Sequence, residues 1–248
     1  MSKLKIITIV GDSLSMVRSG KEIFNFYQDT YPFLLQELLW IDNYLVVLRS
    51  RIRNNVLTES LKENLEEDVL FNNSRYVVLH LGIVDCAPRA FSLMQERILY
   101  VFSQTSVLKY FSRLAWWFQS RYRRFFTKYF PKTYVSEEEF REKFSFIVRE
   151  IKNKAKPKKV FVINIADTND KNKLKSFNFE KNILNYNKII EDLVAGNKDF
   201  CELIDLYSQT KNKKEFLWED GIHLMKGAHD YLAQTLCEKI KKEEQLNQ

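Results

Sequence analysis

Five short apolar segments, separated by amphipathic stretches, constrain the fold of this chain more than any other feature of its sequence. The segments are rich in Val, Ile and Leu, and each is followed by a polar turn, as is typical of buried strands. They lie at residues 6–10, 44–48, 76–81, 160–165 and 201–206. Strands that alternate with helices pair in parallel through right-handed crossovers. The pattern therefore predicts an α/β fold, a three-layer αβα sandwich around a parallel sheet of about five strands.

The stretches between these segments carry apolar side chains at helical spacing. The clearest opens with Ser136 as an N-cap, continues with early carboxylates and carries an apolar stripe. The stripe consists of Phe140, Phe144, Ile147 and Ile151. Helices are expected at residues 31–40, 136–154, 185–195 and 225–242. Residues 165–176 are expected to form a mobile loop at the carboxyl end of the fourth strand, where open α/β sheets bind their ligands.

Composition and cysteine usage narrow the class of protein. A chain of 248 residues that is 45% hydrophobic can bury one sizeable core, so a single domain spanning residues 1–248 is expected. Cys86, Cys201 and Cys237 are widely spaced and form no ligand pattern, so neither a disulfide scaffold nor a metal ion is expected. The first apolar run is too short for a signal peptide, and no run has transmembrane length. These features together favour a cytoplasmic protein.

The connection at residues 90–131 is unusual, and we predict that it is a helical insertion. Residues 101–130 contain six basic and no acidic residues, interleaved with aromatic ones. Side chains on one helical face are Leu108, Phe111, Ala115, Phe118, Tyr122, Phe125 and Tyr129. The favoured interpretation is an added helix that covers the fold with this face. The alternative is a peripheral membrane contact through residues 108–130, since Trp116, Trp117 and the arginines suit a membrane interface.

The net charge of +7 indicates an anionic partner without choosing among a nucleic acid, a membrane surface and an acidic sugar. No recognised nucleic-acid-binding motif accompanies the charge, so no nucleic acid is expected as a partner.

The sequence "IITIVGDSL" places Ser13 immediately after the first predicted strand. A serine hydroxyl becomes a nucleophile only when a base removes its proton and a third group orients that base. His80 lies inside a predicted strand and His229 inside the last helix, where both are expected to be structural. His223 instead lies in a loop, in "WEDGIH", three residues after Asp220. The pair can fold back to orient an imidazole toward Ser13.

Gly-Asp-Ser-Leu after the first strand and Asp-x-x-His near the carboxyl end resemble the SGNH hydrolases, the GDSL family of serine esterases and acyltransferases. The resemblance implies a flavodoxin-like fold without a cofactor, in which Ser13 is the nucleophile, His223 the general base and Asp220 its orienting partner. The segments "GDSLSMVR", "DTYPFLL" and "GIVDCAPR" also resemble a bacterial subgroup associated with surface-polysaccharide genes.

The chain departs from this family at the oxyanion hole. Gly82 and Asp85 fit the family's Gly-x-Asn-Asp block, but Val84 occupies the asparagine position. No glycine follows the second strand, where Asn54 and Asn55 stand as replacement donors beside the N–H of Ser13.

Several further residues are candidates for binding the substrate. They are Asp12, Arg18, Arg53, Gly82, Asp85 and Arg89. The guanidinium groups among them would bind a carboxylate or phosphate as readily as an oxyanion. The sequence therefore predicts an enzyme that transfers or hydrolyses an O-acyl group, such as acetyl, on a carbohydrate or glycan precursor, with an anionic substrate expected. The alternative is a catalytically weak or inactive module of the same fold that binds an anionic glycan or a lipid-linked intermediate.

Overall fold

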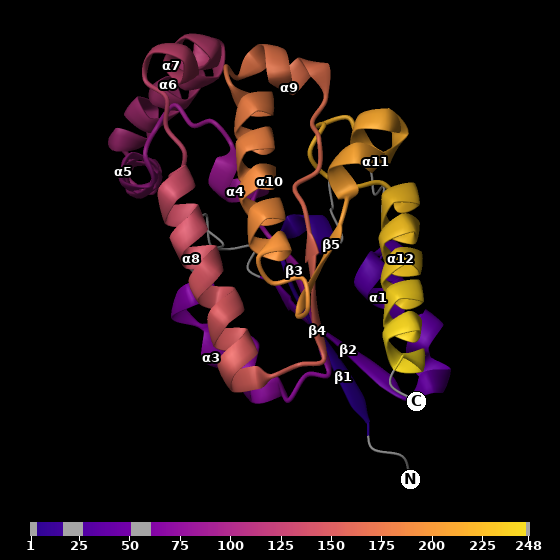
Figure 1. Cartoon of the computed structure of the whole chain (residues 1–248). Coiled ribbons are helices and arrows are strands. Elements are labelled where there is room, and N and C mark those ends of the chain that lie inside the picture. Colours follow the sequence, from indigo (N-terminus) through magenta and orange to yellow (C-terminus); the bar gives the residue numbers. More distant parts are fainter. Residues whose placement is uncertain (1–3, 17–26, 51–60, 247–248) are drawn as a thin grey trace.

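A sheet of five parallel strands forms the centre of the computed structural model, which describes residues 4–16, 27–50 and 61–246 (Figure 1). The strands lie in the order β2-β1-β3-β4-β5. Their bounds are Lys5–Gly11 (β1), Tyr44–Ser50 (β2), Tyr76–His80 (β3), Lys159–Ile163 (β4) and Cys201–Ile204 (β5). All five predicted strands are thereby confirmed. Their apolar composition follows from burial on both faces, since every residue of β3 is buried.

Helices cover both faces of the sheet and complete the three layers that the alternating pattern predicts (Figure 1). On one face, α1 (Tyr31–Leu39) packs against α12 (Lys226–Gln245). On the other, α8 (Glu137–Glu150) packs against α10 (Phe179–Ala195). The four expected helices are confirmed, although α10 begins earlier than residue 185. Phe179 and Ile183 are buried and extend its apolar face upstream.

The apolar stripe of α8 shows how sequence pattern becomes packing. Its four members, Phe140, Phe144, Ile147 and Ile151, are all at most 1% exposed. The helix starts at a capping box in which the Ser136 hydroxyl accepts from the Glu139 N–H and the Glu139 carboxylate accepts from the Ser136 N–H.

Shorter elements connect the layers. The short α-helices are α3 (Leu65–Asp68), α4 (Ile83–Cys86), α9 (Asp170–Lys175) and α11 (Leu206–Asn212). Single 3₁₀ turns are η1 (Ser13–Ser15), η2 (Tyr27–Asp29), η3 (Trp40–Asp42), η4 (Leu70–Asn72) and η6 (Lys214–Phe216), and η5 (Ile151–Ala155) is a π-helical turn. The segment expected as a loop at residues 165–176 therefore contains a helix, α9, which Asn169 caps by accepting from the Asn172 N–H.

The strand order places a topological switch point between β1 and β3. The chain passes from β1 to β2 on one side and then returns to β3 on the other side of β1. Open α/β sheets bind ligands at the carboxyl ends of the strands at such a point. Ser13 follows β1 and the Gly82 segment follows β3, so both lie at this edge of the sheet.

Between α4 and α8 the chain forms three helices, α5 (Leu93–Ser103), α6 (Leu108–Arg121) and α7 (Arg123–Tyr129). They project beyond the carboxyl end of the sheet (Figure 1). The expectation that their apolar face covers the fold is wrong. The six large members of that face are between 39% and 72% exposed, whereas the buried residues of α6 and α7 are Ser112 and Thr127. In the part of the chain that the structure describes, no helix combines the length and apolar character needed to cross a membrane.

Candidate active site

The turn after β1 presents Ser13 at the carboxyl end of the sheet. Asp12 caps the η1 turn by accepting from the Leu14 N–H at 2.8 Å, and its carbonyl accepts from the Ser15 hydroxyl at 2.7 Å. Gly11 is required because a Cβ there would lie 2.5 Å from the Ser15 Oγ. The Gly-Asp-Ser sequence thus folds into a tight turn that holds Ser13 partly exposed above two buried neighbours, Asp12 and Leu14.

The loop between η6 and α12 brings Asp220 and His223 to this turn. The Asp220 Oδ1 accepts from the backbone N–H groups of Ile222 and His223 at 2.9 and 3.0 Å. Its Oδ2 lies 2.5 Å from the His223 Nδ1, and the His223 Nε2 lies 3.1 Å from the Ser13 Oγ. Gly221, with a φ of +69°, provides the left-handed conformation that closes this loop.

These three side chains form a continuous hydrogen-bonded series. Burial opposes ionisation of Asp220, but hydrogen bonds from the His223 ring and the two backbone N–H groups outweigh it and lower its pKa to about 2. Because this carboxylate is ionised at neutral pH, it accepts the Nδ1 proton of His223. The Nε2 lone pair is then directed at the Ser13 hydroxyl, as nucleophilic activation requires.

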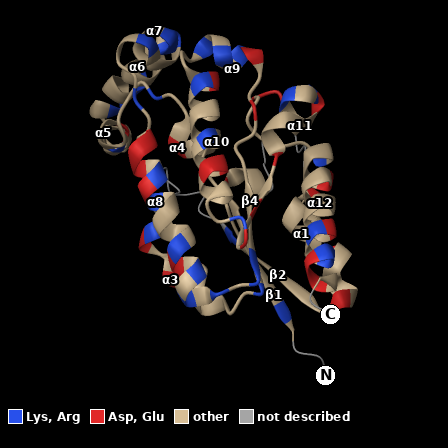
Figure 2. Cartoon of the chain, in the orientation of Figure 1, with Lys and Arg blue, Asp and Glu red and all other residues tan. Residues whose placement is uncertain are grey.

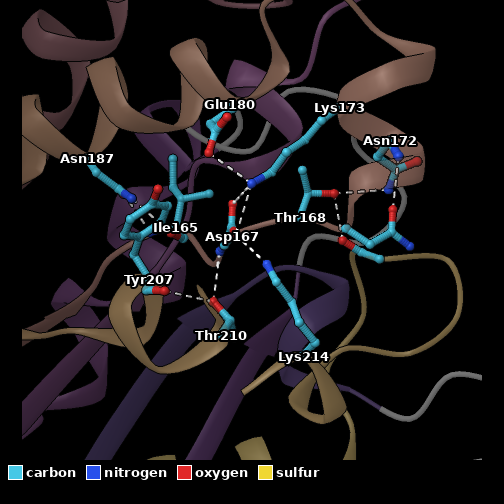
Figure 3. Close-up of polar contacts among 12 residues, drawn as sticks. Ile165, Asp167, Thr168, Asn172, Lys173, Glu180, Asn187, Tyr207, Thr210 and Lys214 are labelled. Carbon is cyan, nitrogen blue, oxygen red and sulfur yellow. Dashed lines mark hydrogen bonds and ion pairs between the residues drawn. The ribbon is translucent and has the colours of Figure 1, made fainter. Parts of the chain in front are cut away.

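Hydrogen bonds from the segment after β4 hold in place the loop that carries Asp220 and His223 (Figure 3). Asn169, Thr168 and Asn172 donate side-chain hydrogen bonds to three successive carbonyl oxygens. The acceptors are Glu219 (3.1 Å), Asp220 (2.6 Å) and Gly221 (2.8 Å), with Asn172 on Asp220 and Thr168 on Gly221. Asn172 also donates to the Thr168 hydroxyl at 3.0 Å. The backbone that carries the triad loop is therefore fixed at Glu219, Asp220 and Gly221.

That segment is in turn anchored by an ion cluster around the buried Asp167 (Figure 3). The Asp167 carboxylate has no exposed surface and pairs with Lys173 at 3.1 Å and Lys214 at 2.7 Å. Lys173 also pairs with Glu180 on α10 at 2.9 Å. The main chain of Ile165 is held by its own pair of hydrogen bonds with the side chain of Asn187. The side chains of Thr168, Asn169 and Asn172 thus form a clamp on the loop that carries Asp220 and His223. This clamp is held in place by ion pairs with α10 and η6.

A cleft of about 350 Å³ opens above Ser13 and His223. Its walls are formed by Ile83, Val84, Ala87, Arg89, Arg123, Asn172, Lys175, Phe179 and Ile222. No acidic side chain is among these residues, while three of them are cations. A larger depression of about 600 Å³ lies around Lys5, Arg75 and Lys158, at the amino ends of the strands and away from this chemistry.

The structure sorts the residues that the sequence singled out. Ser13, Asp220 and His223 converge, and Arg89 lines the cleft beside them. Asn54, Asn55, Arg18 and Arg53 lie outside the described residues. The three remaining candidates, Asp12, Gly82 and Asp85, are buried and do not line the cleft, so the geometry disfavours direct substrate contact by their side chains. Val84 does line it, where the family's asparagine would stand.

Asp12 and Asp85 belong to a buried polar layer beneath the cleft. Burial, opposed by the hydrogen bond from the Leu14 N–H and aided by the nearby charge of Asp85, raises the pKa of Asp12 to about 7. His80 and His229 are each 1% exposed, as expected of structural histidines, and burial lowers their pKa values to about 3 and about 4. His229 is neutral because its Nδ1 accepts from the Tyr31 N–H at 3.2 Å.

Arg123, Lys175 and Asn172 also line the cleft, although the sequence patterns did not single them out. Arg123 stands in the run "RYRRFF", where nothing local distinguishes it from its basic neighbours. Asn172 stands in an Asn- and Lys-rich segment with no recognised motif. These residues reach the cleft because of where α7 and α9 lie in the fold.

Comparisons with known proteins agree with this architecture. No family model and no curated protein matches the sequence. Among solved structures, a lipase/acylhydrolase from Enterococcus faecalis is 16% identical with a TM-score of 0.64, and the alignment covers 96% of each chain. The acetyl xylan esterase AlAXEase is 20% identical with a TM-score of 0.61, over 96% of this chain and 100% of the other. The acetylxylan esterase Axe2 from Geobacillus stearothermophilus is 15% identical with a TM-score of 0.61, over 95% and 94%.

The fold is therefore that of the SGNH hydrolases, an αβα sandwich around a parallel sheet, and the resemblance read from the two sequence motifs is confirmed at the level of the fold. Within this fold, the two motifs form a Ser-His-Asp constellation at the carboxyl end of β1.

Proposed function

We propose that this chain is a serine-dependent O-acyl esterase or acyltransferase that acts on an acylated carbohydrate or glycan precursor through an acyl-serine intermediate. The observation that carries the proposal is the hydrogen-bonded series from Ser13 through His223 to Asp220, with separations of 3.1 and 2.5 Å. Both distances are within the reach that general-base activation of a serine needs. The low pKa of Asp220 favours the required tautomer of His223.

In this mechanism, the Ser13 Oγ attacks the ester carbonyl while its proton passes to the His223 Nε2. The resulting imidazolium is stabilised by the Asp220 carboxylate. Collapse of the tetrahedral intermediate breaks the bond to the alcohol, which leaves with the proton from Nε2. Water or a sugar hydroxyl then attacks the acyl-serine and gives its proton to the His223 Nε2. When this second intermediate collapses, the bond from the acyl carbon to the Ser13 Oγ breaks and Nε2 returns the proton to Oγ. Hydrolysis and transfer differ only in this acceptor.

The oxyanion site distinguishes this chain from the family pattern. The Ser13 N–H has no hydrogen-bond partner among the described residues and is one donor for the oxyanion. Val84 offers no side-chain donor, and both N–H bonds of Asn172 are already occupied. Loss of one oxyanion donor lowers the rate by about 100- to 1,000-fold in well-studied serine enzymes. If Asn54 and Asn55, which lie outside the described residues, supply no second donor, a slow enzyme is expected. A binding module without turnover is the second candidate function.

Two observations support a carbohydrate ester as the substrate. The cleft of about 350 Å³ above Ser13 is lined by polar and cationic groups beside apolar side chains, which suits a small acyl group on a polar alcohol. Two of the structurally similar proteins are named acetyl xylan esterases. The three cysteines are free and buried, in keeping with the expected reducing, cytoplasmic location.

Labelling with a fluorophosphonate probe, followed by mass-spectrometric mapping, tests the proposal. We expect a single adduct on Ser13, lost in Ser13→Ala and slowed in His223→Gln. Hydrolysis of p-nitrophenyl acetate should disappear in the same variants. Equal labelling and equal hydrolysis by wild type and Ser13→Ala would remove Ser13 from the mechanism. Absence of any label on a folded protein would favour the non-catalytic binding module.

A further inference from the structure

Two arginines from different parts of the chain meet in the cleft above Ser13. Arg89 follows α4, and Arg123 begins α7 of the helical insertion. The Arg123 Nε donates to the Ser176 hydroxyl at 2.7 Å, and its Nη2 donates to the Pro88 carbonyl at 3.0 Å. The Arg89 guanidinium lies over the Tyr134 ring at 4.2 Å. Both side chains are thus held in place rather than free in solvent.

Arg123 keeps its positive charge in an unfavourable environment. Burial lowers the pKa of Arg123, and the positive charge of Arg89 lowers it further. Neither arginine forms an ion pair with a carboxylate of the described residues. Glu96 is close enough to act on Arg123 in the opposite direction, but its carboxylate accepts a hydrogen bond from Tyr134. The buried Arg89 Nε has no hydrogen-bond partner in the described part of the chain.

We infer that Arg89 and Arg123 form an anion subsite for the substrate, which takes a carboxylate or a phosphate on the sugar that carries the ester. Such a group would relieve the repulsion between the two guanidiniums, since neither has a carboxylate partner among the described residues. Planar guanidinium groups bind carboxylate and phosphate in bidentate fashion. Lys175 adds a third positive charge to the same wall. The inference rests on the proposed function, since it names the substrate class of that site.

Three esters that carry acetyl at the same ring hydroxyl and differ only at C6 test this subsite. They are the methyl glycosides of acetylated glucose, acetylated glucuronic acid and acetylated glucose 6-phosphate. For wild type, kcat/KM should be roughly 10- to 100-fold higher for an anionic ester than for the neutral one, the range that a charged hydrogen bond provides. The two anionic esters show whether a carboxylate or a phosphate is preferred. Arg89→Met and Arg123→Met should each remove most of this ratio.

Arg121→Met is the matched control, since Arg121 lies on the same insertion, is exposed and does not line the cleft. It should leave the ratio unchanged. Circular dichroism and thermal unfolding are used to check that each variant folds. If Arg123→Met does not fold, Arg89→Met still tests the subsite. A wild-type ratio near one, or a ratio that survives both cleft variants, would overturn the subsite.

The subsite can fail separately from the enzymatic proposal. If no ester is turned over, the subsite is tested by calorimetric titration of the wild-type protein with methyl glucuronoside and glucose 6-phosphate. Binding that Arg123→Met weakens supports the subsite in a non-catalytic module. Absence of binding by both compounds overturns it.

A different observation, the outward face of the insertion, carries a second inference. The exposed large side chains on α5, α6 and α7 include Tyr110, Phe111, Leu114, Trp117 and Phe125, each more than half exposed. Between Glu96 and Glu137 the chain has no acidic residue. Figure 2 shows Lys and Arg on α6 and α7 without an acidic neighbour on either helix. A large exposed apolar patch flanked by one sign of charge marks an interaction surface.

We propose that this face docks on an anionic lipid membrane. Aromatic and apolar side chains enter the headgroup region while Lys and Arg meet anionic lipids. A second copy of the chain fits less well, because the same cations would face one another. Since Arg123 of α7 also lines the cleft, docking would bring the cleft near the membrane surface.

Sedimentation with vesicles tests the docking. We expect binding to phosphatidylcholine vesicles that contain phosphatidylglycerol, weakened by salt, and little binding to phosphatidylcholine alone. The double variant Phe111→Ser/Trp117→Ser should lose binding without a change in thermal unfolding. Phe71→Ser is the control, because Phe71 is 73% exposed, as Phe111 is at 72%, but lies on η4 before β3, at the other end of the sheet.

Failure to sediment with anionic vesicles at low salt would overturn the docking. So would a concentration-dependent dimer that the double variant abolishes, which would assign the face to a second copy.

Discussion

The side-chain amide of Asn172 donates a hydrogen bond to the backbone carbonyl of Asp220, 2.6 Å away. The first residue belongs to α9, after the fourth strand, and the second to the loop before the last helix. This bond joins two chain segments that supply different parts of the site. The triad geometry therefore depends on a residue that has no part in proton transfer.

Replacement of Asn172 should slow the chemistry through the position of the triad. Asn172→Ala removes two hydrogen bonds and should lower the unfolding free energy by about 1–2 kcal/mol. Asn172→Asp should be worse than Ala, because a carboxylate cannot donate and would repel the Asp220 carbonyl. The rate of Ser13 modification by a fluorophosphonate should fall by up to roughly 100-fold, since small misplacements of reacting groups have effects of that size.

Asn185→Ala is the control for this prediction. Asn185 is half-buried, and its side chain donates to the Glu137 carboxylate near the surface, at 2.7 Å and far from the triad loop. Its replacement should change neither quantity noticeably. A normal modification rate in Asn172→Asp would show that the triad loop keeps its place without the clamp.

Asp220→Asn should reduce kcat by roughly 1,000- to 10,000-fold, as loss of the triad carboxylate does in other serine hydrolases. The amide of an asparagine would donate to the His223 Nδ1 and force the ring proton onto Nε2, which then cannot accept the proton of Ser13. The measurement is p-nitrophenyl acetate hydrolysis against pH. Because the pKa of Asp220 is about 2, wild-type activity should show no transition from this group near neutrality. Asp230→Asn, at an exposed surface ion pair with Lys226, should retain full activity.

The central features of the fold follow from local sequence, because buried parallel strands and helix stripes have strong periodic patterns. Ser13, Asp220 and His223 could also be found from sequence, since each lies in a short motif whose position relative to the strands is predictable. The outward face of the insertion could not. A stripe such as Phe111 and Phe118 shows that one helical face is apolar, but not what that face contacts.

The clamp and the anion subsite depend on tertiary placement that no local pattern records. Asn169 caps α9, a helix of only six residues, so the Asn- and Lys-rich segment was expected to be a loop. This segment is held in place by long-range contacts such as the ion pair between Asp167 and Lys214. Arg123 differs from Arg121 and Arg124 only in the direction that α7 gives it.

Asp12 should make stability depend on pH near neutrality. Burial raises its pKa from 3.8 to about 7 in the folded protein. Between these values the unfolded chain has released the proton and the folded chain keeps it, so the unfolding free energy falls as pH rises through this window. Above about pH 7 the folded protein holds a buried charge, which corresponds to a loss of order 4 kcal/mol.

Asp12→Asn should remove this dependence, because an amide keeps the acceptor for the Leu14 N–H without a charge. The measurement is the free energy of unfolding in urea for both proteins across the window from acid to neutral pH. The difference should grow with pH in favour of the variant. Parallel curves would show that Asp12 has an ordinary pKa in the folded protein.

Gly221→Ala should disturb the triad from within its own loop. Gly221 has a φ of +69°, and a Cβ would lie 2.1 Å from the Asn169 Cγ. We expect a loss of about 1–3 kcal/mol in unfolding free energy from backbone strain and a fall in kcat as His223 shifts. Gly196→Ala is the control, since Gly196 has a φ of −70° and the Asp192 carbonyl oxygen would lie an ordinary 3.4 Å from the Cβ. Asn169→Ala removes this contact but also the α9 cap, so Gly221→Ala is measured in the Asn169→Ala background as well as in wild type. The glycine replacement should cost less stability in that background, a partial recovery. No recovery would assign the whole effect to the backbone conformation of Gly221.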